Sequence, residues 1–299
     1  MPELPEVETI VRGLQKDLKD CLITDVDIRE QKVIGFPDSD SFRQLLNNIK
    51  IEDIHRRGKY IVFHLQHKKK KAISLSGKQL SGETPSKIEY LQHRYLIVHL
   101  RMTGKLLIKN KNDQIHKHTH VIFHLNNSYQ LRFNNVRKFG RMYLVDENKL
   151  EKAGGFCKLG PEPLARNFTV GDFKELFTGR SRIIKALLLQ QDFVAGLGNI
   201  YTDEALFRAG IDPRRKANSL QDKEIRQLYQ AVREVLREGI KYCGTSISDY
   251  VNSWGESGSF QQRLRVYQKD GQPCSLCGQE IMKIKAAGRG THFCPHCQN

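Results

Sequence analysis

The sequence lacks any uninterrupted apolar stretch of the roughly 20 residues that a membrane-spanning helix requires, so we expect no membrane association. Acidic residues are also scarce. Asp and Glu number 33 against 49 Lys and Arg among 299 residues, which gives a formal net charge of +16. Such a surplus favours a polyanionic partner, and nucleic acid is the commonest one. The length is sufficient for two domains, each with its own core.

The seven cysteines do not form the even set typical of a secreted disulfide framework. The chain opens with prolines and acids instead of a basic segment followed by an apolar one, so we expect no secretory signal and a cytoplasmic protein. Cys21, Cys157 and Cys243 stand alone, and we expect each to be a small buried residue.

Hydrophobic periodicity divides the chain into a β-rich part and a helical part. Apolar residues recur every three or four positions over residues 4–18, which predicts an amphipathic helix. Short runs of β-branched and aromatic residues then predict an antiparallel sandwich or barrel up to about residue 144; they include residues 60–65, 95–100, 120–125 and 130–133. Helical periodicity returns later, at residues 170–177, 181–189, 199–209 and 222–242. We therefore predict a mainly β domain at 1–148, a helical domain at 160–260 and a C-terminal segment at 261–299.

A polar segment at residues 66–94 interrupts the β-rich part. It contains four consecutive lysines, Lys68 to Lys71, and then Ser-Gly-Glu-Thr-Pro-Ser. A run of like charges is usually an exposed loop, so we interpret this segment as a solvated insertion, with a contribution to DNA binding as the alternative.

Four cysteines near the C-terminus have the spacing of a metal site. Cys274 and Cys277 form one pair, Cys294 and Cys297 the other, and 16 residues separate the pairs. Two such pairs suit one tetrahedral Zn²⁺ in a structural role. The intervening loop includes Arg289, for which a solvated turn residue is the simpler interpretation without a wider context.

A glycine-containing turn, Gly196-Leu-Gly198-Asn199, precedes one of the predicted helices. Glycines at such a position allow backbone N–H groups to approach a phosphate, and the helix dipole favours an anion there. Asn199 would cap the helix or donate to a phosphate oxygen. Simple capping is the alternative.

Proline directly after the initiator methionine has no structural explanation in a helix start. If Met1 is removed, Pro2 becomes a terminal secondary amine, and an α-amine titrates near pH 8 against about 10 for lysine. Such an amine can attack a carbonyl-like carbon and form an iminium, with Glu3 placed for proton transfer. The alternative is that Glu3, Glu6 and Glu8 only complement the helix dipole.

With these residues the chain resembles the formamidopyrimidine-DNA glycosylases over nearly its whole length. The motifs that carry the resemblance are Met1–Thr9, Arg56–Tyr60, His99–Gly104, Val136–Gly140, Leu159–Pro163, Gly196–Tyr201 and Gly288–Cys297. The resemblance implies an α+β protein with an N-terminal β-sandwich flanked by helices, a helix–two-turn–helix domain and a four-cysteine zinc finger. Damaged double-stranded DNA would lie between the two parts of a monomer.

The resemblance also implies an enzyme that excises oxidised purines (8-oxoguanine and formamidopyrimidines) and then cuts the strand. Pro2 would form the imine that undergoes β- and δ-elimination, Glu3 would act as general acid and base, and Glu6 would support it. Lys59 would meet the phosphate beside the lesion. Lys59 is also the rival nucleophile, although an unperturbed lysine is almost wholly protonated at neutral pH.

The remaining residues that the resemblance implicates contact DNA. Met102, Arg137 and Phe139 would fill the gap left by the flipped nucleotide, with Arg137 facing the orphaned cytosine. Core packing is the alternative for Met102 and Phe139. Asn199 and Arg289 would hold the backbone at the kink, Arg289 as part of the catalytic set, and His118 would bind DNA as well.

Three positions depart from the family pattern. Thr103 replaces a glutamate found in some relatives, Asn135 stands where many carry aspartate, and Ser248 stands where many carry arginine. None of them bears on the imine chemistry, but all three bear on lesion preference and on recognition of the opposite base.

Two rival functions fit part of the pattern. An endonuclease VIII-like enzyme would prefer oxidised pyrimidines, but the Leu4-Pro5-Glu6 opening and the Met102, Arg137 and Phe139 set favour the purine branch. A non-catalytic zinc-ribbon protein that binds DNA would fit the charge and the cysteines, but it gives no reason for Pro2 and Glu3.

Overall fold

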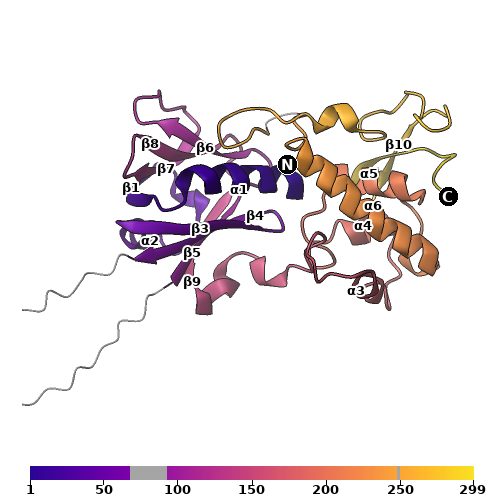
Figure 1. Ribbon diagram of the computed structural model, residues 1–299, viewed down its shortest axis with the longest axis horizontal. Coiled ribbons are helices and arrows are strands. Elements are labelled where there is room, and N and C mark those ends of the chain that lie inside the picture. Colours follow the sequence, from indigo (N-terminus) through magenta and orange to yellow (C-terminus); the bar gives the residue numbers. More distant parts are fainter. Residues whose placement is uncertain (68–92, 248–249) are drawn as a thin grey trace, which may run out of the picture.

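The computed structural model describes residues 1–67, 93–247 and 250–299, and it places a β-rich N-terminal half beside a helical C-terminal half (Figure 1). The first half contains α1 (Leu4–Leu18), β1 (Leu22–Ile28), β2 (Ile34–Phe36), α2 (Ser39–Leu46), β3 (Ile49–Arg57), β4 (Tyr60–His67), β5 (His93–His99), β6 (Gly104–Asn110), β7 (Thr119–Leu125), β8 (Tyr129–Asn135) and β9 (Arg141–Asp146). The second half contains α3 (Val170–Glu175), α4 (Ile184–Leu188), α5 (Asn199–Ala209), α6 (Asp222–Lys241), β10 (Met282–Ala286) and β11 (Arg289–Phe293).

The strands of the first half form a sheet that folds back on itself. Their order is β2-β9-β5-β4-β3-β1-β7-β8-β6, and the pairs are antiparallel except β2 with β9. Only Leu22 and Ile23 of β1 pair with β3, whereas the rest of β1 pairs with β7. This short junction lets the β9-β5-β4-β3 part face the β1-β7-β8-β6 part around one apolar core. The predicted sandwich is confirmed.

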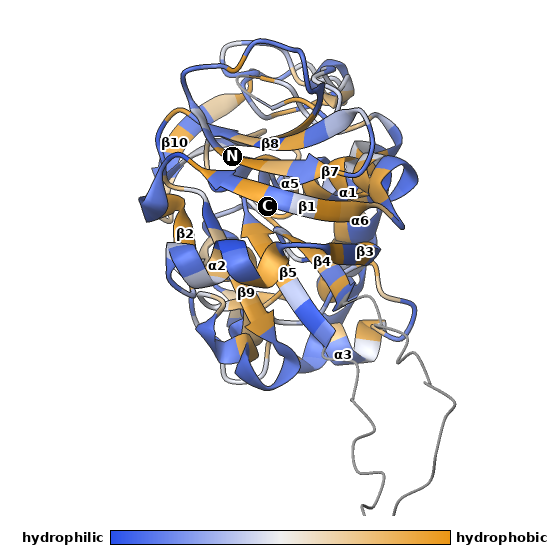
Figure 2. Ribbon diagram, turned by 90° about the vertical axis from the view of Figure 1, so that its left-hand side faces the viewer, coloured by the Kyte–Doolittle hydropathy of each residue, from blue (hydrophilic) through white to orange (hydrophobic). Residues whose placement is uncertain are grey.

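Alternation along the strands explains where this core lies. On β4, Ile61, Phe63 and Leu65 are buried in it, while Tyr60 and Val62 belong to a smaller cluster on the other face. Successive side chains of a strand point to opposite faces of the sheet, so alternate residues of β4 enter the two clusters. Figure 2 shows the strands as largely apolar and the outer loops as largely polar.

Helix α1 belongs to both halves of the molecule. Val7, Ile10, Val11 and Leu14 pack into the sandwich core, whereas Leu4 at the start of the helix packs into the core formed by α3 to α6. The N-terminus therefore lies at the junction of the two halves, as Figure 1 shows.

The periodicity located the long helices well. The bounds predicted for α1 and α5 agree with the structure, and α6 ends one residue earlier than predicted. Helix α2 was not anticipated inside the β-rich region. Asp38, which accepts a hydrogen bond from the Ser41 N–H, and the buried pair Phe42 and Leu46 were its available signals.

The single cysteines correct one prediction. Cys157 and Cys243 are exposed and Cys21 is half-buried, so none of the three is the buried residue that we expected. Cys157 lies in a short 3₁₀ segment and Cys243 follows the end of α6, where the chain has left the core.

The predicted insertion at residues 66–94 is described by the structure only at its two ends. Residues 66, 67, 93 and 94 of the predicted insertion belong to β4 and β5, and the rest of it lies outside the described residues, as does Ser248. The domain limits 1–148, 160–260 and 261–299 stay predictions.

Among the helices that the structure describes, none has both the length and the apolar character that crossing a membrane demands.

Candidate active site

A cavity of about 780 Å³ lies where the two halves meet. Six residues singled out from the sequence line it: Glu3, Lys59, Met102, Phe139, Asn199 and Arg289. Met1 also lines the cavity, and Pro2, which stands between Met1 and Glu3, is buried. The structure therefore brings the chain start, a carboxylate and a lysine to one enclosed place.

The carboxylate of Glu3 is held by the start of α5. It accepts the backbone N–H groups of Gly198 at 2.8 Å, Ile200 at 3.0 Å and Tyr201 at 3.3 Å. The helix start therefore does bind an anion, but that anion is the Glu3 side chain and not a phosphate. Burial raises the pKa of Glu3 above its ordinary value, against the opposing effects of Lys59 and these N–H groups. A raised pKa makes the carboxylate a stronger base than an exposed glutamate, which suits a group that must both give and take a proton.

Gly198 is necessary for this contact. A Cβ atom on it would lie 2.3 Å from the Cδ atom of Glu3, far inside van der Waals contact. Its φ of −133° is ordinary extended backbone, so the requirement is close approach and not conformation.

Glu6, in the first turn of α1, fixes the chain start. Its carboxylate accepts the Glu3 N–H at 2.8 Å, the Tyr201 hydroxyl at 2.7 Å and the Thr245 N–H at 2.7 Å. Burial, and next the charge of Glu3, raise the pKa of Glu6 to about 7. The Glu6 carboxyl therefore holds a proton more tightly than an exposed glutamate does.

Lys59 occupies a tight turn between β3 and β4. Gly58 has a φ of +56°, and its N–H donates to Glu162, which also accepts from Arg56 and Arg57. These contacts tie the turn to the start of the second half. Burial lowers the pKa of Lys59, against the attraction of Glu3 and Glu6. Lys59 is therefore not the unperturbed amine that was expected, and its lowered pKa makes it a better nucleophile than an exposed lysine.

Met102 and Phe139 are large apolar side chains that the fold leaves in solvent. They are 42% and 54% exposed, which rules out the core-packing alternative. Each follows a residue of left-handed backbone, Arg101 with a φ of 55° and Lys138 with a φ of 57°. Such backbone is uncommon outside glycine and often marks a functional loop. The exposed side chain of Arg137 donates to the Met102 sulfur at 3.4 Å, and Met102 and Phe139 both line the cavity.

Two of the positions that depart from the family pattern support the loop with Arg137. Thr103 and Asn135 are buried and hydrogen-bonded to each other, and Thr103 accepts the Arg137 N–H at 3.1 Å. His118 is half-buried, and its carbonyl accepts the Asn135 N–H at 3.0 Å. The loop with Arg137 therefore rests on residues from three strands or their ends.

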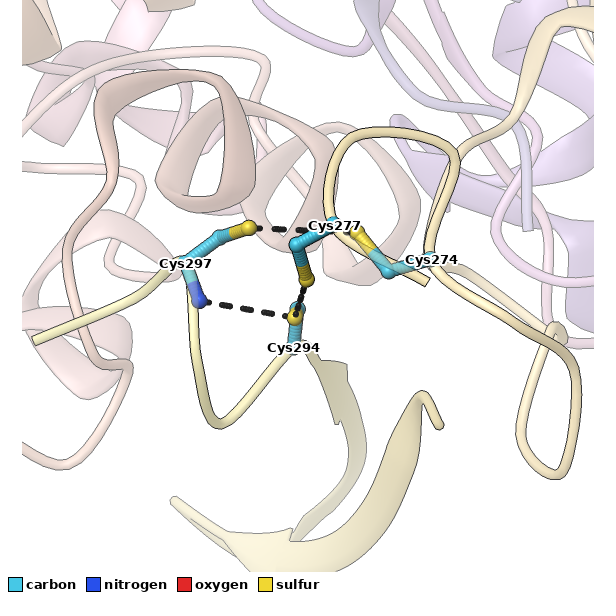
Figure 3. Close-up of side chains that lie close together, drawn as sticks. All are labelled: Cys274, Cys277, Cys294 and Cys297. Carbon is cyan, nitrogen blue, oxygen red and sulfur yellow. Dashed lines mark hydrogen bonds between the residues drawn. The ribbon is translucent and has the colours of Figure 1, made fainter. Parts of the chain in front are cut away.

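The four C-terminal cysteines converge as the spacing predicted (Figure 3). The sulfur atoms of Cys274 and Cys297 are 3.9 Å apart, and those of Cys277 and Cys294 are 3.5 Å apart. A tetrahedral Zn²⁺ with Zn–S bonds of about 2.3 Å separates its sulfurs by roughly 3.8 Å, so the four thiolates fit this metal. Zinc there would contribute structure and not reaction chemistry, because four protein ligands leave no open position.

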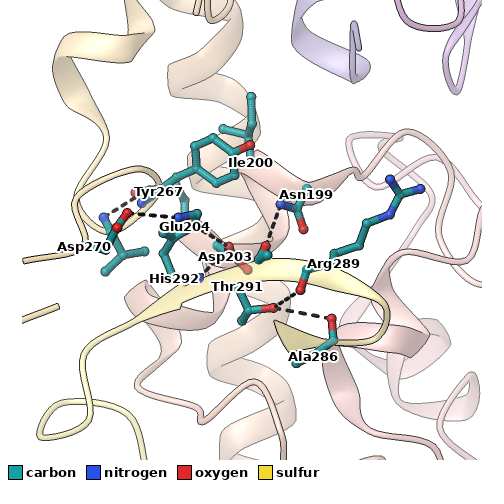
Figure 4. A network of polar contacts seen from close by, with 12 residues as sticks. Asn199, Ile200, Asp203, Glu204, Tyr267, Asp270, Ala286, Arg289, Thr291 and His292 are labelled. Carbon is teal, nitrogen blue, oxygen red and sulfur yellow. Dashed lines mark hydrogen bonds and ion pairs between the residues drawn. The ribbon is translucent and has the colours of Figure 1, made fainter. Parts of the chain in front are cut away.

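The strand pair β10–β11 next to these cysteines is fastened to α5 (Figure 4). Asp203 accepts from the Lys185 ammonium at 2.6 Å and from the His292 N–H at 3.0 Å, and all three residues are buried. Asn199 donates to the Gly290 carbonyl at 2.9 Å. Arg289, exposed at the hairpin turn, is thereby held at the cavity.

The cavity also includes residues that the sequence did not single out. His99, Arg101, Arg141, Tyr143, Gln191, Ile200 and Tyr267 line it. Burial, and next the charges of Arg101 and Lys59, lower the pKa of His99 to about 3, so this imidazole is neutral. His99 and Arg101 lie in a motif already quoted, but Tyr267 lies in none, and only the fold brings it to the site.

Three family models match consecutive parts of this chain. The formamidopyrimidine-DNA glycosylase N-terminal domain matches residues 1–142, the formamidopyrimidine-DNA glycosylase H2TH domain matches residues 159–251, and a zinc finger found in FPG and IleRS matches residues 271–299. The chain belongs to the formamidopyrimidine-DNA glycosylase family. The resemblance inferred from seven motifs is thus confirmed.

Relatives align with the chain from end to end. A formamidopyrimidine-DNA glycosylase of Desulforamulus reducens is 44% identical over 299 residues, which cover 100% of this chain and 99% of the relative. A formamidopyrimidine-DNA glycosylase of Listeria innocua is 41% identical, and the match covers 100% of both chains.

Solved structures of the family share the fold. A point mutant of the Lactococcus lactis FPG in complex with Fapy-dG-containing DNA has a TM-score of 0.85 at 35% identity, with 100% of both chains covered. A complex of the Lactococcus lactis Fpg with abasic-site DNA has a TM-score of 0.84 at 35% identity, with 99% of both chains covered.

Proposed function

We propose that this family member is a base excision repair enzyme that removes oxidised purines from double-stranded DNA and then cleaves the strand. The observation that carries the proposal is the position of the chain start. Pro2 is buried and stands between Met1 and Glu3, which both line the cavity, and the carboxylate of Glu3 is fixed by three backbone N–H groups. A non-catalytic zinc-ribbon protein would not need this arrangement, and the family matches cover all three parts of the chain.

The proposed reaction begins after loss of Met1. The Pro2 amine attacks the anomeric carbon of the damaged nucleotide, and the bond to the base breaks. The sugar ring then opens at the C1′–O4′ bond, O4′ takes a proton, and the resulting iminium permits β- and then δ-elimination of the flanking phosphates. Glu3 gives and takes the protons, and burial raises its pKa, which favours its acid form more than in an exposed glutamate. Glu6 keeps the chain start in place through the Glu3 N–H.

The proposed DNA contacts follow from exposure and charge. Met102, Arg137 and Phe139 are exposed and would enter the space vacated by the flipped nucleotide, with Arg137 facing the opposite cytosine. Lys59 and Arg289 at the cavity would meet phosphates of the damaged strand. Asn199 would act through the hairpin that it holds, and His118 beside the Arg137 loop would contact the backbone.

We further propose that the cysteine site holds one structural Zn²⁺ and that the enzyme acts as a monomer in the cytoplasm. The thiolate geometry supports the metal. A site made of free thiolates is typical of a reducing compartment.

Borohydride trapping on a duplex with 8-oxoguanine opposite cytosine tests the chemistry. We expect a stable protein–DNA adduct that maps by mass to an N-terminal peptide beginning at Pro2. The lowered pKa of Lys59 makes mapping essential. An adduct on Lys59, or full trapping by protein that retains Met1, would overturn the proposed nucleophile.

Two further measurements complete the test. Glu3→Gln should slow base excision strongly and leave DNA binding nearly intact, because it removes the proton-transfer group and preserves the shape. Comparison of 8-oxoguanine with an oxidised pyrimidine should favour the purine. A clear preference for the pyrimidine would support the endonuclease VIII-like rival instead.

A further inference from the structure

Three side chains with metal-binding atoms converge on the sandwich, away from the cavity and from the four cysteines. Glu52 of β3, His64 of β4 and His93 of β5 each offer one ligand atom, and these atoms lie within 4.8 Å of one another. No part of the proposed repair chemistry uses them.

The strand register explains why they meet. His64 pairs with Tyr95 and Gln66 pairs with His93, so His64 and His93 are diagonal neighbours on one face of β4 and β5. The pairing of β3 with β4 shifts between Ile51 and Asp53, which makes Glu52 the extra residue of a β-bulge. A bulge redirects a side chain that regular pairing would place elsewhere, and bulges are frequent next to functional sites.

The contacts within this group are unusual for a set of polar side chains. Nδ1 of His64 lies 3.3 Å from Oε2 of Glu52, and Nδ1 of His93 lies 3.9 Å from the same oxygen. Oε2 of Glu52, Nε2 of His64 and Nδ1 of His93 are all shielded from solvent, and none has a hydrogen-bond partner in the described part of the chain. Buried polar atoms normally have partners, so three orphaned atoms in one place require an explanation.

An ion pair explains only part of this geometry. The contact of His64 with Glu52 engages the carboxylate, but His93 faces the same oxygen at a longer distance, with its ring only 4.9 Å from the His64 ring. A cation bound between the three residues would give the Glu52 oxygen and the facing Nδ1 atoms of His64 and His93 one shared partner. Zinc with ligand bonds of about 2.1 Å in tetrahedral geometry separates its ligand atoms by roughly 3.4 Å, close to the shorter of the two measured distances.

We propose that Glu52, His64 and His93 bind a divalent transition-metal ion of the zinc type, with a fourth position open to water. Two imidazoles and one carboxylate are a donor set for zinc and its neighbours, whereas magnesium and calcium prefer oxygen ligands. His64 stacks on Tyr95 at 5.1 Å with an interplanar angle of 7°, which holds the imidazole in place. The bound ion would fasten β3, β4 and β5 together where β4 ends and β5 begins.

Titration of the full-length, zinc-loaded protein with Co²⁺ tests this site apart from the cysteines. We expect one additional equivalent of Co²⁺ to bind with weak visible bands and without the strong thiolate charge-transfer absorption of a four-cysteine site. Glu52→Gln and His93→Gln should each weaken this binding at least tenfold. His124→Gln, which removes an imidazole of β7 outside the group, should leave it unchanged. Zinc added to the same protein should raise the Tm of the wild type and of His124→Gln, but not of Glu52→Gln.

Two results would contradict the proposed site. The absence of an additional equivalent at saturating Co²⁺ would overturn the proposal. So would an additional equivalent that persists in both Glu52→Gln and His93→Gln, since the metal would then bind elsewhere.

Discussion

Thr103 donates its hydroxyl to Oδ1 of Asn135 at 2.8 Å, across 32 positions of sequence. Both residues are buried, and the same hydroxyl accepts the N–H of Arg137. One oxygen atom therefore connects the end of β8 with the loop that carries the exposed arginine. Both positions depart from the family pattern, and their side chains are hydrogen-bonded to each other.

Replacement of Thr103 by valine should misplace Arg137 without removing it. Thr103→Val leaves the Arg137 N–H and the Asn135 Oδ1 without their partner, at a cost of about 1–3 kcal/mol in the free energy of unfolding. We expect discrimination for cytosine opposite the lesion to fall as it does in Arg137→Ala, with a smaller loss of general DNA affinity. Excision rates on the four opposite bases measure this. Thr103→Ser keeps the hydroxyl and should retain the wild-type ranking; equal losses for serine and valine would argue against the hydrogen bonds.

Replacement of Gly198 by alanine should displace the Glu3 carboxylate. The added Cβ atom would lie 2.3 Å from Cδ of Glu3 in backbone that alanine tolerates. We expect base excision to fall by at least tenfold in single-turnover experiments, whereas affinity for abasic-site DNA changes little. Gly171→Ala is the matched control, because its Cβ atom would meet only Thr169 Oγ1 at 3.4 Å. Normal excision by Gly198→Ala would contradict the proposed role of the helix start.

The buried Glu6 should make stability depend on pH. Its pKa in the folded state is about 7 against an ordinary value of 4.5, so the folded protein binds this proton more tightly than the unfolded chain does. The contribution of this proton to the free energy of unfolding is full below about pH 4.5 and is lost as the pH rises through 7. At about 1.4 kcal/mol for each pH unit in this window, the free energy of unfolding relative to Glu6→Gln should fall by about 3 kcal/mol between pH 4.5 and 7. Denaturant unfolding of both proteins over pH 4.5–8 measures the difference, and parallel curves would contradict it.

Loss of one cysteine ligand should affect DNA binding more than chemistry at the chain start. Cys294→Ser leaves three thiolates, so the metal should be lost and the hairpin that positions Arg289 should loosen. We expect the bound zinc to fall to near zero and DNA affinity to fall at least tenfold. Cys157→Ser, which changes an exposed cysteine elsewhere, should keep both. A Cys294→Ser protein with bound metal and full affinity would show that the four-cysteine assignment is wrong.

Local patterns were sufficient to predict features that depend on neighbouring residues. The apolar repeat located α1 and α5, and the cysteine spacing located a site whose sulfur atoms do converge. Motifs also identified Glu3 and Lys59, although their roles stay proposals. These predictions succeed because helix periodicity and ligand spacing act over a few residues.

Features that depend on contacts between residues far apart in the chain could not be predicted from local sequence patterns. The glycine turn before α5 suggested a phosphate site, and nothing near it indicated that a side chain from position 3 occupies the helix start. The meeting of Glu52, His64 and His93 depends on the register of three strands and on one bulge. A shift of one residue in that register would place the side chains on the opposite face.

The bond between Glu3 and Gly198 spans 195 positions of sequence. During synthesis the glutamate emerges almost first, while the N–H groups that hold it emerge about two-thirds of the way along the chain. A nascent protein, or a fragment truncated before α5, therefore has no partners for this carboxylate. Strand-cleavage activity should consequently arise only once the helical half has been made. Separately expressed halves should recover this activity only by reassociating.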